Sequence, residues 1–120
     1  MNRMELAKKV RKTAGTLLYE KGYVSPVDLM LGMDKLSKED YDAWRKKKVS
    51  YLERVLKGNL NQLNFILKQL KNYGKEHGLK PSKTVYRSWG KGAKVNLRFS
   101  KSGNNYMEEA YSTHFVRIKK

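Results

Sequence analysis

Basic and aromatic side chains are interleaved between positions 83 and 101, a mixture suited to binding an anionic polymer. Lysine and arginine attract phosphates, and an exposed ring can stack on a base. We therefore predict a nucleic-acid-binding site formed by Lys83, Arg87, Trp89, Lys91, Lys94, Arg98 and Lys101, with an additional basic patch at Arg45, Lys46, Lys47 and Lys48. Strand alternation would place Tyr86 on the opposite face from Arg87 and Trp89, so at least one of the two rings is expected in the core.

The charge balance of the whole chain supports the same chemistry. The net charge is +16, from 27 Lys and Arg against 11 Asp and Glu. Seven of the acids precede residue 43, and between residues 43 and 107 only Glu53 and Glu76 oppose sixteen basic residues. Such a field concentrates phosphate-bearing partners but does not distinguish DNA from RNA, and it would attract an acidic protein as well. A solubilising surface would have the same composition.

Composition also bears on other classes of protein. The chain has no cysteine and two histidines, so we expect neither a disulfide framework nor a metal site, and no cofactor is implied. The longest apolar stretch, residues 27–33, is interrupted by Asp28 and Gly32 and is too short to cross a bilayer. We expect a cytoplasmic protein without a membrane partner. Its 120 residues predict one domain, 1–120.

The N-terminal two thirds of the sequence predicts helices. Apolar residues at three- and four-residue steps indicate a helix over residues 3–21 that ends at Gly22. Ser25 and Ser37 have the features of helix N-caps and predict short helices over residues 26–31 and 38–47. The spacing of Ser50 and Glu53 resembles a capping box, and apolar residues continue behind it at helical steps, so we predict one long helix over residues 50–77.

The composition changes after Pro81 and predicts an α+β fold. Residues 84–89 and 94–99 are rich in β-branched and aromatic side chains, and a glycine-containing turn lies between them. We predict a basic β-hairpin there, followed by a short helix at residues 106–111 and a last strand at 114–118. The predicted domain has a helical part, 1–79, and a β-hairpin with a C-terminal element, 80–120, which packs on the long helix.

Several sequence runs, spread over residues 20–116, resemble a family of small basic bacterial proteins for which no activity is established. They are KGYVSPVD at residues 21–28, Trp44-Arg45, YLER at 51–54, GLKPS at 78–82 and LRFSKSG at 97–103. The resemblance implies a bacterial origin and a one-domain unit. It implies no catalytic residue, so the function must be argued from the side chains themselves.

Two other segments could bind a polyanion. The helix pair predicted between Ser25 and Lys48 has the length of a helix-turn-helix, but Glu39, Asp40 and Asp42 would face the nucleic acid at the start of its second helix. The polar loop at residues 100–104 could hold a phosphate on free backbone amides, although two glutamates follow closely.

Two alternatives to nucleic-acid binding remain open at this stage. One is a protein-interaction or adaptor module for an acidic partner. The other is a ribonuclease-like enzyme, for which His114 with Glu108, Glu109 and Tyr111 is the cluster of titratable groups that the sequence offers. A histidine beside an aromatic residue more often serves packing, so we expect no catalytic residue and leave enzymatic activity as the weaker alternative.

Overall fold

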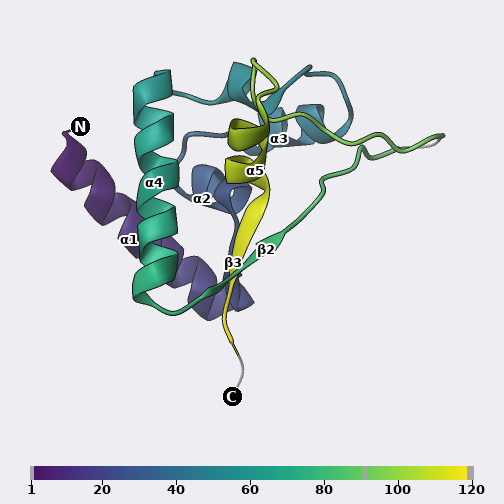
Figure 1. Ribbon diagram of the computed structural model, residues 1–120. Coiled ribbons are helices and arrows are strands. Elements are labelled where there is room, and N and C mark those ends of the chain that lie inside the picture. Colours follow the sequence, from purple (N-terminus) through teal and green to yellow (C-terminus); the bar gives the residue numbers. More distant parts are fainter. Residues whose placement is uncertain (1, 91, 119–120) are drawn as a thin grey trace.

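The computed structural model describes residues 2–90 and 92–118 and has the predicted α+β architecture (Figure 1). Helices dominate, and a small antiparallel sheet lies beside them. In chain order the elements are α1 (Arg3–Lys21), β1 (Tyr23–Val24), α2 (Pro26–Gly32), α3 (Lys38–Arg45), the 3-10 helix η1 (Leu52–Val55), α4 (Leu60–Glu76), β2 (Lys80–Lys83), α5 (Asn105–Ser112) and β3 (Thr113–Val116).

The first three helices begin and end close to their predicted positions because their caps are local. The hydroxyls of Ser25 and Ser37 accept from the amides of Asp28 and Asp40 at 3.0 and 3.1 Å. Gly22 ends α1 in the left-handed conformation at φ 80°, and its amide donates to a carbonyl one turn earlier. The buried face of α1 contains Leu6, Val10 and Ala14, whereas Met4 is 70% exposed.

The predicted long helix over residues 50–77 is wrong in its first third. The chain forms only the short η1, becomes extended at Leu56, and turns at Gly58 with φ 110°. Asn59 then caps a new helix, α4, by accepting from the amide of Gln62 at 2.8 Å. Glu53 does not close a capping box. Its carboxylate instead accepts from the hydroxyl of Tyr111 at 2.9 Å, so a distant contact replaces the local one.

The sheet has the strand order β1-β3-β2, and both pairings are antiparallel. The expected last strand is therefore present, and it occupies the centre of the sheet. Its Phe115 lies opposite Val24 on one side and Pro81 on the other. The same ring packs so closely on α4 that a Cβ added to Gly74 would lie 2.6 Å from it. The last strand thus packs on α4, but the predicted packing of the hairpin itself on this helix is wrong, because residues 84–90 and 92–98 lie on the other side of the molecule (Figure 1).

The predicted hairpin is present only in a reduced form. Residues 84–90 lead away from the body and residues 92–98 return, but one isolated bridge, between Arg87 and Asn96, is the β-pairing found in the described part of this segment. Two backbone hydrogen bonds accompany it, from Leu97 to Tyr86 at 2.8 Å and from Ser88 to Val95 at 2.9 Å. We call residues 84–90 and 92–98 the arm. It projects from the body on the side opposite α4 (Figure 1).

A core rich in aromatic rings holds the base of the arm to the helices. Trp44 of α3 is fully buried, and its indole donates to the carbonyl of Arg98 at 2.8 Å. Phe99 packs between Trp44 and Tyr111, with centroids 5.3 and 5.8 Å away. The returning part of the arm therefore enters the core at Leu97 and Phe99.

Candidate nucleic-acid interface

The two basic segments predicted from the sequence meet at Trp89. The amide of Trp89 donates to the carbonyl of Arg45 at 2.7 Å, which fastens the outgoing strand of the arm to the end of α3. The guanidinium carbon of Arg45 lies 4.9 Å from the centre of the Trp89 ring, and the ring of Tyr41 meets Trp89 edge-on. Trp89 nevertheless remains 41% exposed. The ring is therefore held by Arg45 and Tyr41 and is partly open to solvent, as a stacking platform requires.

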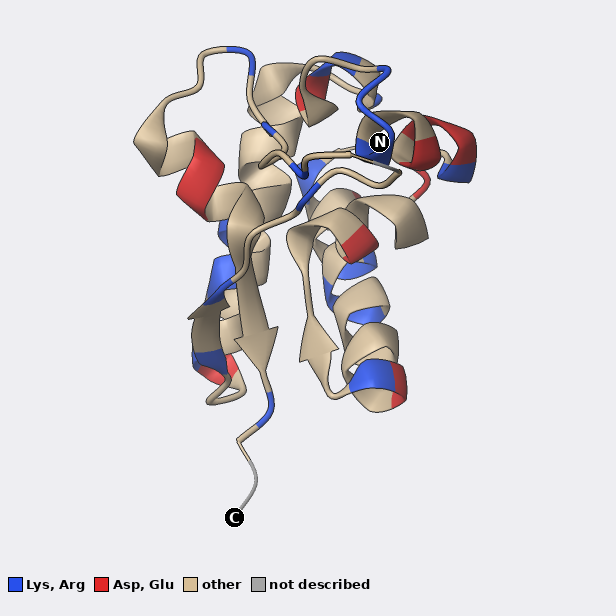
Figure 2. Ribbon diagram, turned by 90° about the vertical axis from the view of Figure 1, so that its right-hand side faces the viewer, with Lys and Arg blue, Asp and Glu red and all other residues tan. Residues whose placement is uncertain are grey.

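Exposed cations lie close in the chain to the residues that hold this ring. Lys46, Lys47 and Lys48 follow α3 directly, and Arg87 and Lys94 lie on the two sides of the arm. Figure 2 shows these basic segments on the arm and on the turn after α3. The ammonium of Lys94 donates to the carbonyl of Gly90 at 2.5 Å. Lys83 is exposed at the end of β2, where the arm begins. The prediction for Lys91 lies outside the described residues.

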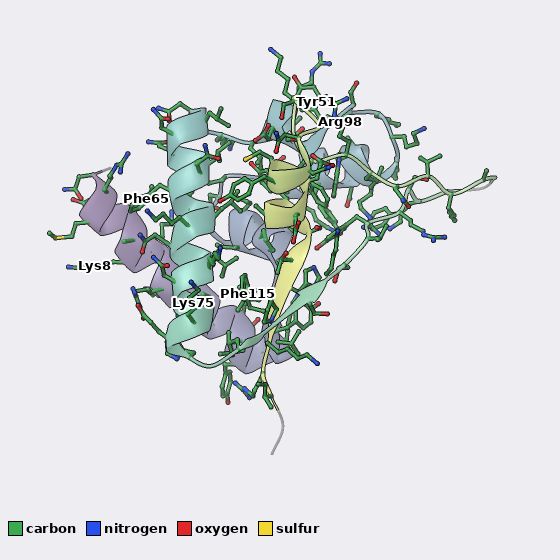
Figure 3. The ribbon with its side chains drawn as sticks, viewed as in Figure 1. Lys8, Tyr51, Phe65, Lys75, Arg98 and Phe115 are labelled. Carbon is green, nitrogen blue, oxygen red and sulfur yellow. The ribbon has the colours of Figure 1, made fainter. Side chains whose placement is uncertain are left out.

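Arg45 and Arg98 are placed differently from the other predicted contacts. The guanidinium of Arg45 lies over the rings of Tyr86 and Trp89, which makes it a support for the platform. Arg98 donates from Nε to the carbonyl of Ser100 at 2.8 Å and from Nη2 to the carbonyl of Lys101, and it lies 5.6 Å from the ring of Tyr51 (Figure 3). It thereby holds the loop after the arm in shape, whereas the side chain of Lys101 is exposed.

Two carboxylates, those of Glu53 and Glu108, already occupy backbone amides of the loop at residues 100–104. The carboxylate of Glu108 accepts from the amides of Phe99 and Ser100 at 3.0 and 2.7 Å and from the Ser100 hydroxyl at 2.6 Å. The amide of Lys101 donates to Glu53 at 2.9 Å. We call Glu53 and Glu108 the carboxylate clamp. An anion at this loop would have to displace the clamp, so the loop is a poor phosphate site.

The clamp also affects the electrostatics of the arm, because acids bound to amides are not paired with cations. Within residues 2–90 and 92–118, the ion pairs are Arg11 with Glu76 at 2.6 Å, Lys21 with Asp28 at 3.1 Å and Lys38 with Asp42 at 3.2 Å. None of the three involves the arm or the turn after α3. Within the described residues, the lysines and arginines of the arm and of the turn after α3 are therefore not engaged in ion pairs.

The acid-base cluster considered for an enzyme is not assembled. His114 stacks on Tyr23, with ring centroids 5.4 Å apart, and its Nε2 lies 3.1 Å from the Tyr86 hydroxyl. Glu108 belongs to the clamp, and the Tyr111 hydroxyl donates to Glu53. Burial lowers the pKa of His114 and raises the pKa of Tyr86 to about 12, so both groups are neutral near pH 7. The contacts of His114 are those of a packing residue.

The helix pair α2 and α3 is present, but it presents the wrong charges for reading a duplex. Most of α2 is buried through Pro26, Val27, Leu29 and Met30. The first turn of α3 carries Glu39 and Asp40, the residues that a recognition helix would direct toward base edges. These helices act as part of the core, and α3 contributes to the candidate interface through Arg45 and Tyr41, which contact Trp89.

The described residues also bear on metals and membranes. In the ranges 2–90 and 92–118 no cluster of histidine and carboxylate side chains is arranged to hold a metal ion. None of the helices in those ranges combines the length and the apolar character needed to cross a bilayer.

Comparisons with protein-family models, with curated proteins and with solved structures gave no match to this chain. The interface is therefore interpreted from its own geometry.

Sequence reasoning missed the two features that shape this interface. One is the support of Trp89 by Arg45, residues that are far apart in the chain but meet through the cation-ring contact. The other is the carboxylate clamp, in which Glu53 and Glu108 accept hydrogen bonds from the loop after the arm. Neither feature has a local sequence signal, although the LRFSKSG run marks the segment that the clamp holds.

Proposed function

We propose that this protein binds nucleic acid through the arm and the adjoining end of α3. The observation that carries the proposal is Trp89, a ring that Arg45 supports on one side and that remains open to solvent amid exposed cations. Lys83, Arg87, Lys94 and Lys101 contact phosphates from the arm and its base, and Lys46, Lys47 and Lys48 extend the contact. Trp89 stacks on a base or a sugar.

Trp89 also provides a local probe for the test. The other tryptophan, Trp44, is 0% exposed in the core, so a ligand at the arm changes the emission of Trp89. We would titrate the full chain with duplex and single-stranded DNA and RNA at about 0.15 M salt and follow tryptophan emission. Saturable quenching is expected, and Trp89→Phe should abolish it because Trp44 does not reach the surface.

The variant that tests the electrostatic part is Arg87→Gln with Lys94→Gln. Arg98 is left unchanged because its guanidinium holds two loop carbonyls. Each lost phosphate contact on a duplex lowers the binding constant by about 0.7 log units near 0.15 M salt, so the two changes predict a loss of about 30-fold. A charge-matched control is Lys8→Gln with Lys12→Gln on α1, where Lys8 points away from the arm (Figure 3).

The outcome separates nucleic-acid binding from the adaptor alternative. A loss in the arm variant that the α1 control does not share supports the proposed site. Equal and weak binding of every polymer, which the arm variant and the control reduce alike, would instead reflect net charge. The proposal would then be rejected, and an acidic protein would become the better candidate partner.

A further inference from the structure

A second polar surface lies on α4. Asn61, Asn64, Lys68, Lys71 and Lys75 follow each other at steps of three and four residues, and all five are exposed. We call these five residues the α4 face. The opposite side of the helix buries Leu63, Ile66, Leu70, Tyr73 and Gly74 in the core. At 1.5 Å per residue the α4 face is about 21 Å long, enough to follow several phosphates.

The charge of the α4 face is uncompensated by its own helix. Glu76 is the single acid of α4, and both of its carboxylate oxygens bind the guanidinium of Arg11, at 2.6 and 2.8 Å. The three lysines have no acidic partner among the described residues. All five side chains of the face are polar, so it offers no apolar group for insertion into a membrane.

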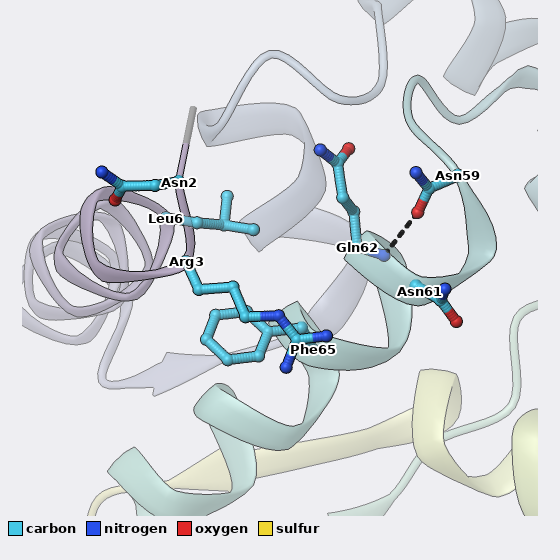
Figure 4. Close-up of a pocket in the computed structure, with 7 residues that line it drawn as sticks. All are labelled: Asn2, Arg3, Leu6, Asn59, Asn61, Gln62 and Phe65. Atoms are coloured by element: carbon cyan, nitrogen blue, oxygen red, sulfur yellow. Dashed lines mark hydrogen bonds between the residues drawn. The ribbon is translucent and has the colours of Figure 1, made fainter.

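A groove beside the face adds hydrogen-bonding and stacking groups. It has a volume of about 290 Å³, and its lining residues are Arg3, Asn61, Asn64, Phe65, Lys68 and Gln69. The guanidinium of Arg3 lies 5.1 Å from the centre of the Phe65 ring (Figure 4). Side-chain amides both donate and accept, as base edges do, and a guanidinium plane stacks on bases. No carboxylate lines the groove.

The α4 face and the arm are on opposite sides of the molecule. Phe65 and Lys75 lie on the side from which Lys8 projects, and the arm leaves from the other side (Figure 3). The longest dimension of the protein is 40 Å, whereas charges in about 0.15 M salt are screened over roughly 8 Å. The two surfaces can therefore bind separate polyanions without mutual repulsion through the body.

We infer that the α4 face with its groove is a second nucleic-acid-binding surface, and that one molecule joins two nucleic-acid segments. The amides and the stacked Arg3 favour a nucleic acid over other polyanions, because they match bases as well as phosphates. Binding at α4 does not depend on the arm. The joining of two segments rests on the proposed function as well.

The test uses the ¹⁵N-labelled full chain and duplexes of about one helical turn, together with single strands, in DNA and RNA forms. The side-chain amide signals of Asn61, Asn64 and Gln69 report on α4, while Trp89 emission reports on the arm. We expect both reporters to respond. Lys68→Gln with Lys71→Gln should weaken the α4 response to a duplex about 30-fold and leave the Trp89 titration unchanged. The matched control is Arg87→Gln with Lys94→Gln, which removes two charges from the arm on the opposite side (Figure 3) and should leave the amide titration unchanged.

Joining is measured by the capture of a second, fluorescent duplex on beads that carry the first. The wild type should capture it, and the α4 variant should bind the beads without capture. Silent amide signals with a responding Trp89 would overturn the inference and leave the proposed function standing. A response to phosphatidylserine vesicles but not to nucleic acid would also overturn it. If the side-chain amides respond and Trp89 does not, nucleic-acid binding at the α4 face is supported. Binding at the arm and the joining of two segments are then both rejected.

Discussion

Replacing Glu108 with alanine should destabilise the protein far more than replacing its neighbour Glu109. The Glu108 carboxylate accepts two amides and a hydroxyl from Phe99 and Ser100, both of which are buried. Glu109 is exposed, and its side chain forms no hydrogen bond within the described residues. A buried donor that loses its acceptor costs about 1–3 kcal/mol, and water can replace part of a clamp near the surface. We therefore expect Glu108→Ala to cost about 3 kcal/mol in all.

The same loss corresponds to a Tm lower by about 12 °C for a domain of this size, whereas Glu109→Ala should stay within about 0.5 kcal/mol of the wild type. Glu108→Gln keeps one acceptor oxygen, so its effect should be intermediate. Urea denaturation, followed by circular dichroism and by emission of the buried Trp44, measures all three variants. Equal midpoints for Glu108→Ala and Glu109→Ala would show that the Glu108 carboxylate does not hold the loop after the arm.

Three further predictions concern packing and pH. Gly74→Ala should cost about 1–3 kcal/mol in thermal melts, because the new Cβ would lie 2.6 Å from Phe115. A Cβ at Gly15 would lie 3.6 Å from its nearest neighbouring atom, so Gly15→Ala should stabilise α1 by up to about 1 kcal/mol. Burial lowers the pKa of His114, so the unfolded chain binds the proton of this residue more tightly than the folded chain does. The contribution of His114 to stability is complete above the ordinary pKa of 6.5 and should fall as the pH drops below it. Urea midpoints measured between about pH 7 and 5.5 should show this loss in the wild type and not in His114→Gln. Burial raises the pKa of Tyr86 from 10.0 to about 12, so stability is present below 10.0 and should be lost as the pH rises through that interval. Tyr86→Phe should reduce this alkaline dependence, and the part that remains includes Tyr111, whose pKa burial also raises.

The local parts of the fold could be predicted because their signals are local. Ser25 and Ser37 cap helices through amides three residues away, and Gly22 ends α1 through a contact within one turn. Apolar spacing also located α4. It failed over residues 50–59, where helical spacing continues although the chain is not helical. The competing partner of Glu53 is Tyr111, 58 residues away, and periodicity has no access to such a contact.

The candidate site also combines features that the sequence predicts with features that depend on distant contacts. The sequence alone determines the number and order of the cations and their mixture with aromatic residues between positions 83 and 101. Those properties make the chain a polycation with an aromatic segment, whatever its fold.

Only the tertiary structure decided which of these groups face a ligand. It placed Trp89 on Arg45 and left the ring open, it directed Arg98 to carbonyls, and it used Glu108 but not Glu109 to hold the loop. Each choice depends on donors and acceptors that approach from distant parts of the chain. Because a buried polar group must find a partner, the packing of the whole domain determines which charges are used inside and which remain available to bind.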